Sequence, residues 1–308
     1  MKQTKTKFFL LSSAILSVII FIFYFLSYFI VINVVSWPQK ILLWLILSVI
    51  LACAITIGYS ITSSAIADAM TTLRRMLRAD NLSHPLIMKL SSEAPGTYHH
   101  SINVSNLAQR AAKSIGADSL LVRTAAYYHD LGKLSDPKIF VENQSQKELL
   151  LEENSSMWIR SNAKKIISHV EKGVKIAKEA GLPDEIIDII AEHHGSSRAL
   201  YFYSRAQEKG LKIKKSDFSY SGPKPQSKES AIVMLADCVE ASIRAKQPIT
   251  KEIITQITSD IIEDKIKEEQ LNLSGLSQRD LQTIKSSLID TLNTIYHQRI
   301  SYDTKDKN

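Results

Sequence analysis

The chain has 308 residues, of which 45% are hydrophobic and 22% charged, so it can bury a substantial core and is not a disordered tail. Its formal net charge is +7, but residues 1–61 hold four lysines and no acid, which leaves 34 basic and 31 acidic residues in the remainder. No basic stripe interleaved with aromatic residues is present, which argues against a nucleic-acid polymer as partner.

The N-terminal part contains two long runs without charge, Phe8 to Val35 and Ile41 to Ile61. At ~1.5 Å per residue, each helix can cross a ~30 Å hydrocarbon core. The first run is too long for the ~7–15-residue core of a signal peptide. Basic residues at positions 2–7 and 74–78 flank the pair, so the positive-inside rule places both ends in the cytoplasm. We predict a transmembrane hairpin over residues 1–61, in contact with lipid in the cell membrane.

A juxtamembrane helix or linker is predicted over residues 62–81. Four apolar residues recur there at helical spacing: Ile66, Met70, Leu73 and Leu77. Such a stripe is compatible with signal transmission or with a homodimer. Packing against the chain's own domain is the favoured interpretation.

Residues 82–308 are predicted to form one cytoplasmic domain. The pattern is helical almost throughout, with Pro, Gly and Ser clusters as breaks and no alternating run long enough for a sheet. The longest irregular stretch is Lys209 to Ser227, which contains a Gly-Pro-Lys-Pro turn signal. The expected fold class is all-α.

Histidines and aspartates of this domain fall on inward-facing positions. In the helix that Pro95 opens, His100 shares its face with Val104 and Leu107, whereas His99 lies on the polar face. The same periodicity turns four further histidines and two aspartates inward: His129, Asp130, His169, His193, His194 and Asp237. Asp118 is a good N-cap for the helix that leads to His129.

A metal centre explains this set better than seven separate buried polar groups. Two buried aspartates without partners would cost several kcal/mol each. Imidazole and carboxylate donors without thiolate are typical of hydrolytic transition-metal sites, and seven donors exceed what one ion takes. Two ions that share one bridging aspartate would account for the count.

These residues also carry a family resemblance. The order His100, His129-Asp130 and Asp237, with the core string "HDLGKL", resembles the signature of the HD phosphohydrolase superfamily. Longer strings, among them "HPLIMKLSSEAPGTYHHSINVSNLA", "AAYYHDLGK", "IIDIIAEHHGSS" and "IYHQRI", resemble the cytoplasmic domain of PgpH-type membrane HD phosphodiesterases, which degrade cyclic di-AMP. The resemblance covers about residues 82–302 and implies an HD-domain helical bundle.

The resemblance further implies how the donors are shared. One metal ion would be held by His100, His129, Asp130 and Asp237, and the other by His169, His193 and His194, with Asp130 as the bridge. Iron or manganese is favoured, and the expected product is linear pApA. Asp130 is thus the central catalytic residue. Lys133 is a candidate substrate contact, with a solvated lysine at a helix end as an equally weighted alternative.

Three alternatives stay open at this point. An HD-GYP relative would hydrolyse cyclic di-GMP, but that family has Gly-Tyr-Pro after its histidine pair, where this chain has Gly195, Ser196 and Ser197. A one-metal nucleotide phosphohydrolase would leave three of the inward histidines without a purpose. A catalytically silent membrane-tethered nucleotide sensor is disfavoured because every ligand position is retained.

Overall fold

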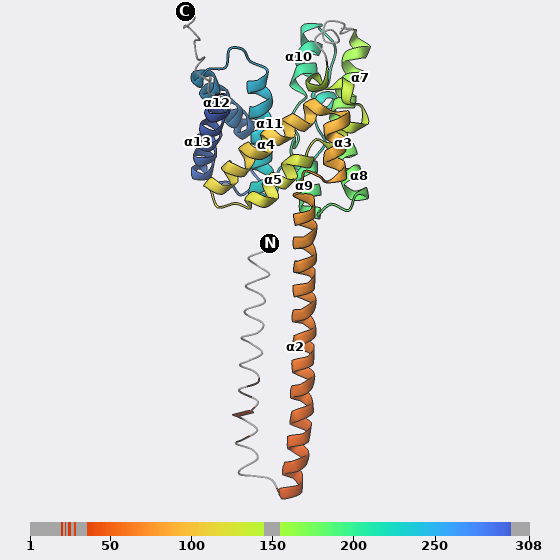
Figure 1. Ribbon diagram of the computed structural model, residues 1–308, viewed down its shortest axis with the longest axis vertical. Helices are drawn as coiled ribbons and strands as arrows, with labels where there is room; N and C mark the ends of the chain where they lie inside the picture. The colour runs from red at the N-terminus through yellow and green to blue at the C-terminus, as the bar shows by residue number, and fades with distance from the viewer. Residues whose placement is uncertain are drawn as a thin grey trace, which may run out of the picture. The chain divides into compact units, whose positions relative to one another are not determined.

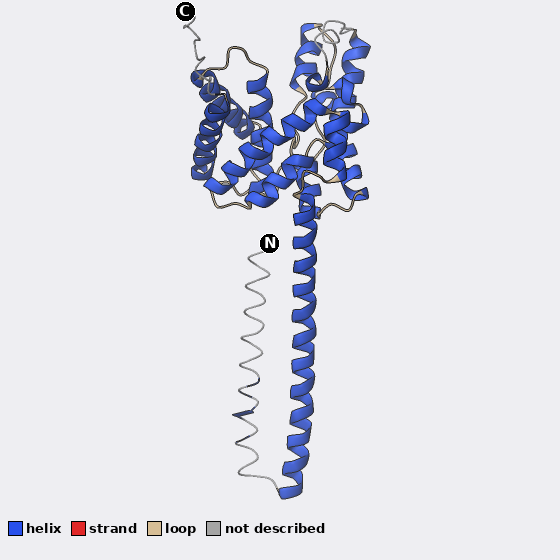
Figure 2. Ribbon diagram, viewed as in Figure 1, coloured by secondary structure: helices blue, strands red, loops and turns tan. Residues whose placement is uncertain are grey.

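The computed structural model describes residues 36–144 and 155–296, together with residues 20, 22, 24, 25 and 28. In these residues the regular structure is helical, apart from an isolated bridge between Arg198 and Ser219 (Figure 2). The predicted all-α class is confirmed. The predicted first span, residues 8–35, lies outside the described residues except for five single positions.

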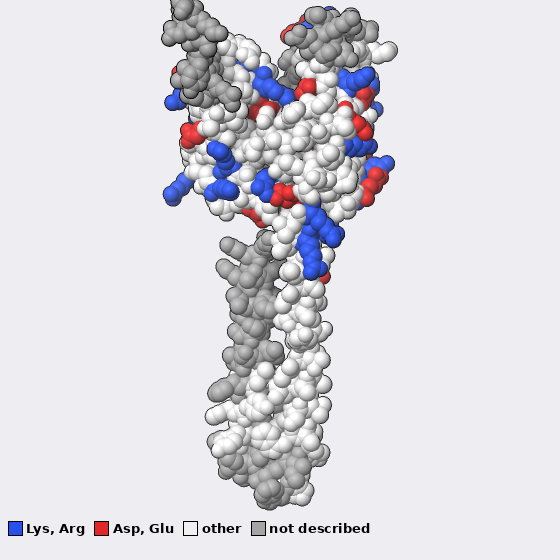
Figure 3. All heavy atoms as spheres, viewed as in Figure 1, with Lys and Arg blue, Asp and Glu red and all other residues white. Residues whose placement is uncertain are grey.

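The longest helix, α2 (Trp37–Ala79), contains a candidate membrane span. Its segment Trp44–Ala79 is long and apolar enough to cross a membrane, and an 18-residue window in it has a mean hydropathy of 2.2. The hydroxyl groups of Ser48 and Thr56 donate to backbone carbonyls one turn earlier, which satisfies them inside the helix as a lipid environment requires. Figure 3 shows α2 without charge over most of its length and with basic side chains near its C-terminal end.

The apolar stripe on α2 does not pack as favoured from the sequence. Leu73 and Leu77 are 46% and 55% exposed, and Ile66 and Met70 are 61% and 45% exposed. The neighbouring residue Met76 packs against the core instead. At its C-terminal end the helix therefore uses a different face for packing, and the predicted packing of Leu73 and Leu77 against the domain is wrong.

The chain divides into two compact units, Met1–Thr71 and Thr72–Asn308. The second unit contains the end of α2 and the following helices (Figure 1). In chain order these are α3 (Pro85–Glu93), α4 (Pro95–Ser114), α5 (Ser119–Tyr128), the 3₁₀ helices η1 (Leu131–Ser135), η2 (Pro137–Ile139) and η3 (Val141–Asn143), α7 (Ser156–Ile167), α8 (His169–Glu179), α9 (Asp184–Glu192), α10 (Leu200–Glu208), η4 (Lys215–Phe218), α11 (Lys228–Arg244), α12 (Lys251–Lys267) and α13 (Gln278–Ile295).

The main core of this unit is built around α4, which packs against α5, α11 and α13. Val104, Leu107 and Ala111 of α4 are fully buried, together with Ala125 of α5 and Val233 of α11. The inward face predicted for α4 is thus the face that packs. A smaller cluster around Ile159, Phe202 and Phe218 joins α7, α10 and η4.

Local signals set the positions of the helices that reach the site. Asp118 caps α5 as predicted, because its carboxylate accepts a hydrogen bond from the amide of Leu121 at 3.1 Å. Pro95 opens α4 and Pro183 precedes α9. The carbonyl of Ala79, the last residue of α2, accepts a 2.7 Å hydrogen bond from the hydroxyl of Tyr128 at the end of α5.

Candidate metal centre

The seven residues predicted from the sequence converge on one place in the second unit. His100 comes from α4 and Asp237 from α11, while the other five stand at helix ends. His129 and Asp130 follow α5, His169 opens α8, and His193 and His194 follow α9: His100, His129, Asp130, His169 and His193 are each at most 2% exposed, Asp237 is 6% exposed, and His194 is part-buried. His99 is exposed, as its polar face predicted.

The turn that carries His129 and Asp130 is not part of a longer helix. Helix α5 ends at Tyr128, and a 3₁₀ helix follows Asp130. A glycine is required in this turn, because a Cβ at Gly132 would lie 1.8 Å from the carbonyl oxygen of His169. Gly173 of α8 faces the same contact, with the amide nitrogen of Gly132 only 3.1 Å from its Cβ position. The close approach places Asp130 beside the start of α8.

Asp130 lies between two sets of histidines and offers one carboxylate oxygen to each. Its Oδ2 is 3.2 Å from Nε2 of His129 and 3.6 Å from Nε2 of His100. Its Oδ1 is 3.3 Å from Nε2 of His169 and 3.9 Å from Nε2 of His193. This is the arrangement a bridging carboxylate needs.

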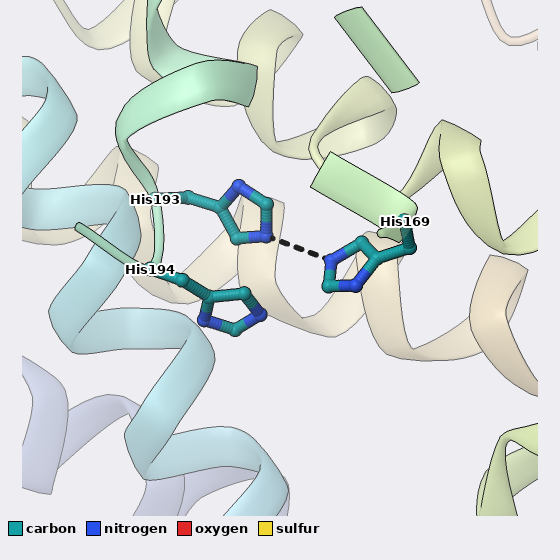
Figure 4. A group of neighbouring side chains, drawn as sticks. All are labelled: His169, His193 and His194. Carbon is teal, nitrogen blue, oxygen red and sulfur yellow. Dashed lines mark hydrogen bonds between the residues drawn. The ribbon is translucent and has the colours of Figure 1, made fainter. Parts of the chain in front are cut away.

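The two sets can each hold a metal ion. In one, donor atoms of His100, His129 and Asp130 lie within 4.8 Å of one another. Asp237 completes this set, with Oδ1 at 2.9 Å from Nε2 of His100 and 3.7 Å from Nε2 of His129. The other set contains the histidines that Figure 4 shows turned toward one another, His169, His193 and His194.

Hydrogen bonds donated to backbone carbonyls fix the orientation of three of these rings. The Nδ1 atoms of His129, His169 and His193 lie 2.8, 2.6 and 2.7 Å from the backbone carbonyls of the residues three positions earlier. A carbonyl can only accept, so the proton is on Nδ1. In a neutral ring this leaves the lone pair of Nε2 free for a metal ion. Against the effect of burial, Asp130 and Asp237 raise the pKa of His129 to about 10, so this ring must give up its Nε2 proton when a metal ion binds.

Unsatisfied atoms at the centre fit a metal ion as well. Nε2 of His129 and both carboxylate oxygens of Asp130 are buried, and among the described residues their contacts are ion-pair contacts without hydrogen-bond geometry. Burial alone would raise the pKa of Asp130, but the charges of His129 and Lys133 outweigh it and hold this pKa well below its ordinary value. Burial, together with His129 and His169, lowers the pKa of His193 to about 3. Asp130 is therefore a carboxylate and His193 a neutral imidazole at pH 7, the forms that bind metals.

Lys133 belongs to the centre and is not a solvated lysine at a helix end. Its Nζ lies 2.8 Å from Oδ2 of Asp130 and 2.7 Å from Oε1 of Glu142, and it stands 4.9 Å from the centre of the Phe140 ring. The side chain is 12% exposed. Its ammonium group therefore has a fixed position at the edge of the metal centre.

Three residues around the centre were not predicted from the sequence. Glu240 accepts from His100, Glu142 pairs with Lys133, and the ring of Tyr220 stacks on His194 with centroids 4.2 Å apart. A signal existed for Glu240, because it lies one helical turn after Asp237 and so shares its face. No pattern in the sequence points to Tyr220, which lies in the irregular stretch before α11.

A cavity of about 710 Å³ opens over the two histidine sets. Its lining includes four of the candidate ligands, His100, His169, His194 and Asp237. Five cationic side chains also line it, Lys133, Arg198, Arg244, Lys265 and Lys267, together with the carboxylates of Glu142, Asp264 and Glu268. A cavity of this size that offers cationic side chains can accept a phosphorylated ligand of dinucleotide size.

The comparisons with known proteins agree with this architecture. The HD domain family model matches residues 97–242. The crystal structure of the phosphodiesterase PgpH HD domain of L. monocytogenes in complex with cyclic-di-AMP superposes with a TM-score of 0.65 at 44% identity, over 71% of this chain and all of that one. The chain therefore belongs to the HD-domain family.

Two full-length relatives are similar over the same region. The chain is 43% identical over 238 residues to the cyclic-di-AMP phosphodiesterase PgpH of Listeria monocytogenes serotype 1/2a (strain 10403S), which covers 77% of this chain and 33% of that protein. It is 42% identical over 228 residues to PgpH of Bacillus subtilis (strain 168), covering 74% of this chain and 32% of that protein. The chain thus spans about a third of the length of the curated relatives it matches.

Proposed function

We propose that this protein is a metal-dependent phosphodiesterase that hydrolyses cyclic di-AMP to linear pApA and so lowers the level of a second messenger. The observation that carries the proposal is the position of Asp130, whose two oxygens face two separate histidine sets. The printed activity of the PgpH relatives, and the cyclic-di-AMP in the complex of one of them, support the choice of substrate.

In this proposal the seven residues divide as the resemblance implies. His100, His129, Asp130 and Asp237 would hold one divalent ion. The other would be held by His169, His193 and His194, with Asp130 as the bridge. Nitrogen and oxygen donors without thiolate suit iron, manganese and zinc, and iron or manganese is the proposed pair.

Metal ions in such a pair supply a water of lowered pKa and neutralise charge on the phosphodiester. The residues of the chain orient the reaction. Asp130 faces both ligand sets and so keeps them at a fixed distance from each other. Lys133 is held between Asp130 and Glu142. It is a candidate contact for a phosphate oxygen or for the leaving ribose oxygen. Cationic side chains of the cavity lining, among them Arg244, are candidates to offset the charge of the substrate's second phosphate.

The segment after the histidine pair supports cyclic di-AMP over cyclic di-GMP. In place of Gly-Tyr-Pro, this chain has Gly195, Ser196 and Ser197, and the two serines are tied to the end of α12 and the turn that follows it. Ser196 donates its amide to the Oε1 of Gln270 at 3.0 Å, and Ser197 accepts from Lys265 at 2.7 Å. The loop after the histidine pair therefore differs from the Gly-Tyr-Pro segment of the HD-GYP family both in sequence and in the contacts that its side chains make.

The test uses the full chain purified in detergent without chelator and reconstituted with Mn²⁺ or Fe²⁺. Incubation with cyclic di-AMP should yield pApA, and incubation with cyclic di-GMP should yield little product, with both followed by chromatography. Elemental analysis should give close to two metal equivalents. Equal or faster hydrolysis of cyclic di-GMP would favour the cyclic di-GMP alternative. Two bound metals without turnover of either dinucleotide would favour a silent sensor.

We further propose a membrane arrangement for the chain. Residues 1–61 form a transmembrane hairpin, residues 62–81 a juxtamembrane helix, and residues 82–308 the catalytic domain in the cytoplasm. The charge-free part of α2 and the arginines near its C-terminal end support this topology. Reporter fusions at both termini should give cytoplasmic signals, and an external signal from either terminus would contradict the hairpin.

The exposed stripe of Ile66, Met70, Leu73 and Leu77 also makes a homodimer part of the proposal. Its spacing of four, three and four residues is that of a coiled-coil seam, and its members are exposed. Cross-linking of the full chain in membranes should capture a dimer. The double variant Leu73→Glu, Leu77→Glu should reduce that product without loss of the metal content.

A further inference from the structure

Two of the five rings in the candidate metal centre, those of His100 and His194, face carboxylates and not backbone carbonyls, with Nδ1 of His194 3.7 Å from Oδ2 of Asp237. The Nδ1 atoms of His129, His169 and His193 face backbone carbonyls. The Nδ1 atom of His100 instead lies 2.5 Å from Oε2 of Glu240, a carboxylate that is 1% exposed. A side chain, and not the backbone, therefore holds this ring.

Two helices build this contact with matching spacing. Asp237 and Glu240 lie three residues apart on α11, and His100 and Asn103 lie three residues apart on α4. Asn103 donates from Nδ2 to the second oxygen of Glu240 at 3.1 Å. Because residues three apart share one face of a helix, α11 brings a candidate ligand and an orienting carboxylate to the same histidine.

We propose that Glu240 is a positioning residue of the metal centre: it fixes the ring of His100 with Nε2 turned toward the ion that Asp237 also binds, and its negative charge strengthens that nitrogen as a donor. The inference rests on the proposed two-metal centre. Carboxylates that accept from the second nitrogen of a metal-bound histidine have this effect in other metal sites, where their loss weakens metal binding about 10- to 100-fold.

The loss of Glu240 should weaken the binding of one ion only. Glu240 touches His100, which belongs to the set with His129 and Asp237, whereas the three histidines of the other set have different partners. A role in folding alone would change the thermal stability of the metal-free protein and would not select one ion. The distinction can be measured without any activity assay.

The experiment compares Mn²⁺ binding to the full chain in detergent, followed by the electron paramagnetic resonance signal of free Mn²⁺. Glu240→Gln keeps the shape and an acceptor for His100 but removes the charge, and Glu240→Ala removes both. Glu229→Gln is the matched control, because it is the same change on the same helix at a residue that bonds to the backbone of Asp118. Circular dichroism of each metal-free variant monitors the fold.

We expect the wild type and Glu229→Gln each to bind two Mn²⁺, and the affinity of each site to be the same in the two proteins. Glu240→Gln should retain one Mn²⁺ at wild-type affinity and bind the other about 10- to 100-fold more weakly, and Glu240→Ala should be weaker still. If Glu240→Gln binds both ions as tightly as wild type does, the role of Glu240 is refuted while the two-metal centre stands. If the wild type binds no Mn²⁺, the proposed centre and this inference both fall.

Discussion

The ring nitrogen Nε2 of His169 lies 3.3 Å from Oδ1 of Asp130, so the residue that opens α8 faces a carboxylate that follows α5. The other oxygen of the same carboxylate faces His129 at 3.2 Å. One side chain thereby connects two groups of ligands that come from different helices. Changes at this position should affect both groups together.

Replacement of Asp130 by alanine should abolish hydrolysis of cyclic di-AMP and lower the metal content. The change removes an anionic ligand from both ions and leaves their mutual repulsion less compensated. We expect a loss of at least ~10²-fold in turnover, because the metal-generated nucleophile is disrupted. Elemental analysis and single-turnover rates measure the two effects.

His99→Ala is the matched control for this substitution. His99 is adjacent to His100 in α4 but exposed, so its removal should leave the metal content and the rate nearly unchanged. A folded Asp130→Ala protein that keeps both metals and near-normal turnover would contradict the bridging role.

Replacement of Lys133 by methionine should destabilise the metal-free protein more than the metal-loaded protein. The change leaves the carboxylates of Asp130 and Glu142 without their shared cation. Removal of one partner of a buried ion pair costs about 3–5 kcal/mol. A bound metal ion supplies positive charge to Asp130 and should restore part of this loss in the free energy of unfolding, measured by urea titration with and without Mn²⁺.

The double variant Lys133→Met, Glu142→Gln tests the origin of that effect. Without the second carboxylate, the metal-free protein should recover a part of its stability. An equal loss for Lys133→Met with and without Mn²⁺ would mean that metal binding does not neutralise Asp130, and it would argue against Asp130 as a ligand.

Removal of metal ions by a chelator should lower the melting temperature of the second unit, Thr72–Asn308. An ion that binds only the folded state at 100 times its Kd adds about 2.7 kcal/mol of stability. For a unit of this size that corresponds to a shift of roughly 5–10 °C. Thermal unfolding followed by circular dichroism should show the loss and its reversal by Mn²⁺, while Ca²⁺, which prefers oxygen ligands, should not reverse it. Full recovery with Ca²⁺ would contradict a site built from imidazoles.

The stability should fall in mild acid through His84, which caps α3. Its Nδ1 accepts from the amide of Leu86 at 3.3 Å, and burial lowers its pKa below the ordinary value of 6.5. The unfolded chain therefore takes up a proton at a higher pH than the folded chain does. The contribution of this group is complete above pH 6.5 and is lost as the pH falls below that value.

His84→Asn should remove this pH dependence, because asparagine keeps a capping acceptor that does not titrate. Between pH 7.5 and 5.5 the wild type should lose more unfolding free energy than the variant, by at most about 1 kcal/mol, the usual worth of a helix cap. Urea unfolding at the two pH values gives the difference. Identical losses in both proteins would show that His84 does not contribute.

Much of the centre could be predicted because helical periodicity sorts residues by face. The choice of His100 over His99 followed from the apolar spacing of Val104 and Leu107, and the structure buries the first and exposes the second. The N-cap Asp118 was predicted on similarly local grounds. Such features depend on a few neighbouring residues, so a single sequence contains them.

Other features depend on contacts between distant segments, which one sequence does not record. The pairing of Lys133 with Glu142 and the stacking of Tyr220 on His194 both cross between elements. The close approach of Gly132 to the start of α8 likewise joins two separate elements. The prediction of which face of α2 packs in its last turns was also wrong. Periodicity shows that an apolar stripe exists, but it does not show which face of the helix the domain covers.

The contact between Gly132 and Gly173 has a consequence for the whole centre. At this point main chain touches main chain, with no room for even a methyl group, and the contact lies between the turn that ends in Asp130 and the helix that begins at His169. The distance between the two ligand sets is therefore a property of the backbone. Substitutions of the candidate ligands should change which ions are held and how tightly, but the spacing between the two proposed ion positions should stay the same, because the contact between Gly132 and Gly173 fixes it.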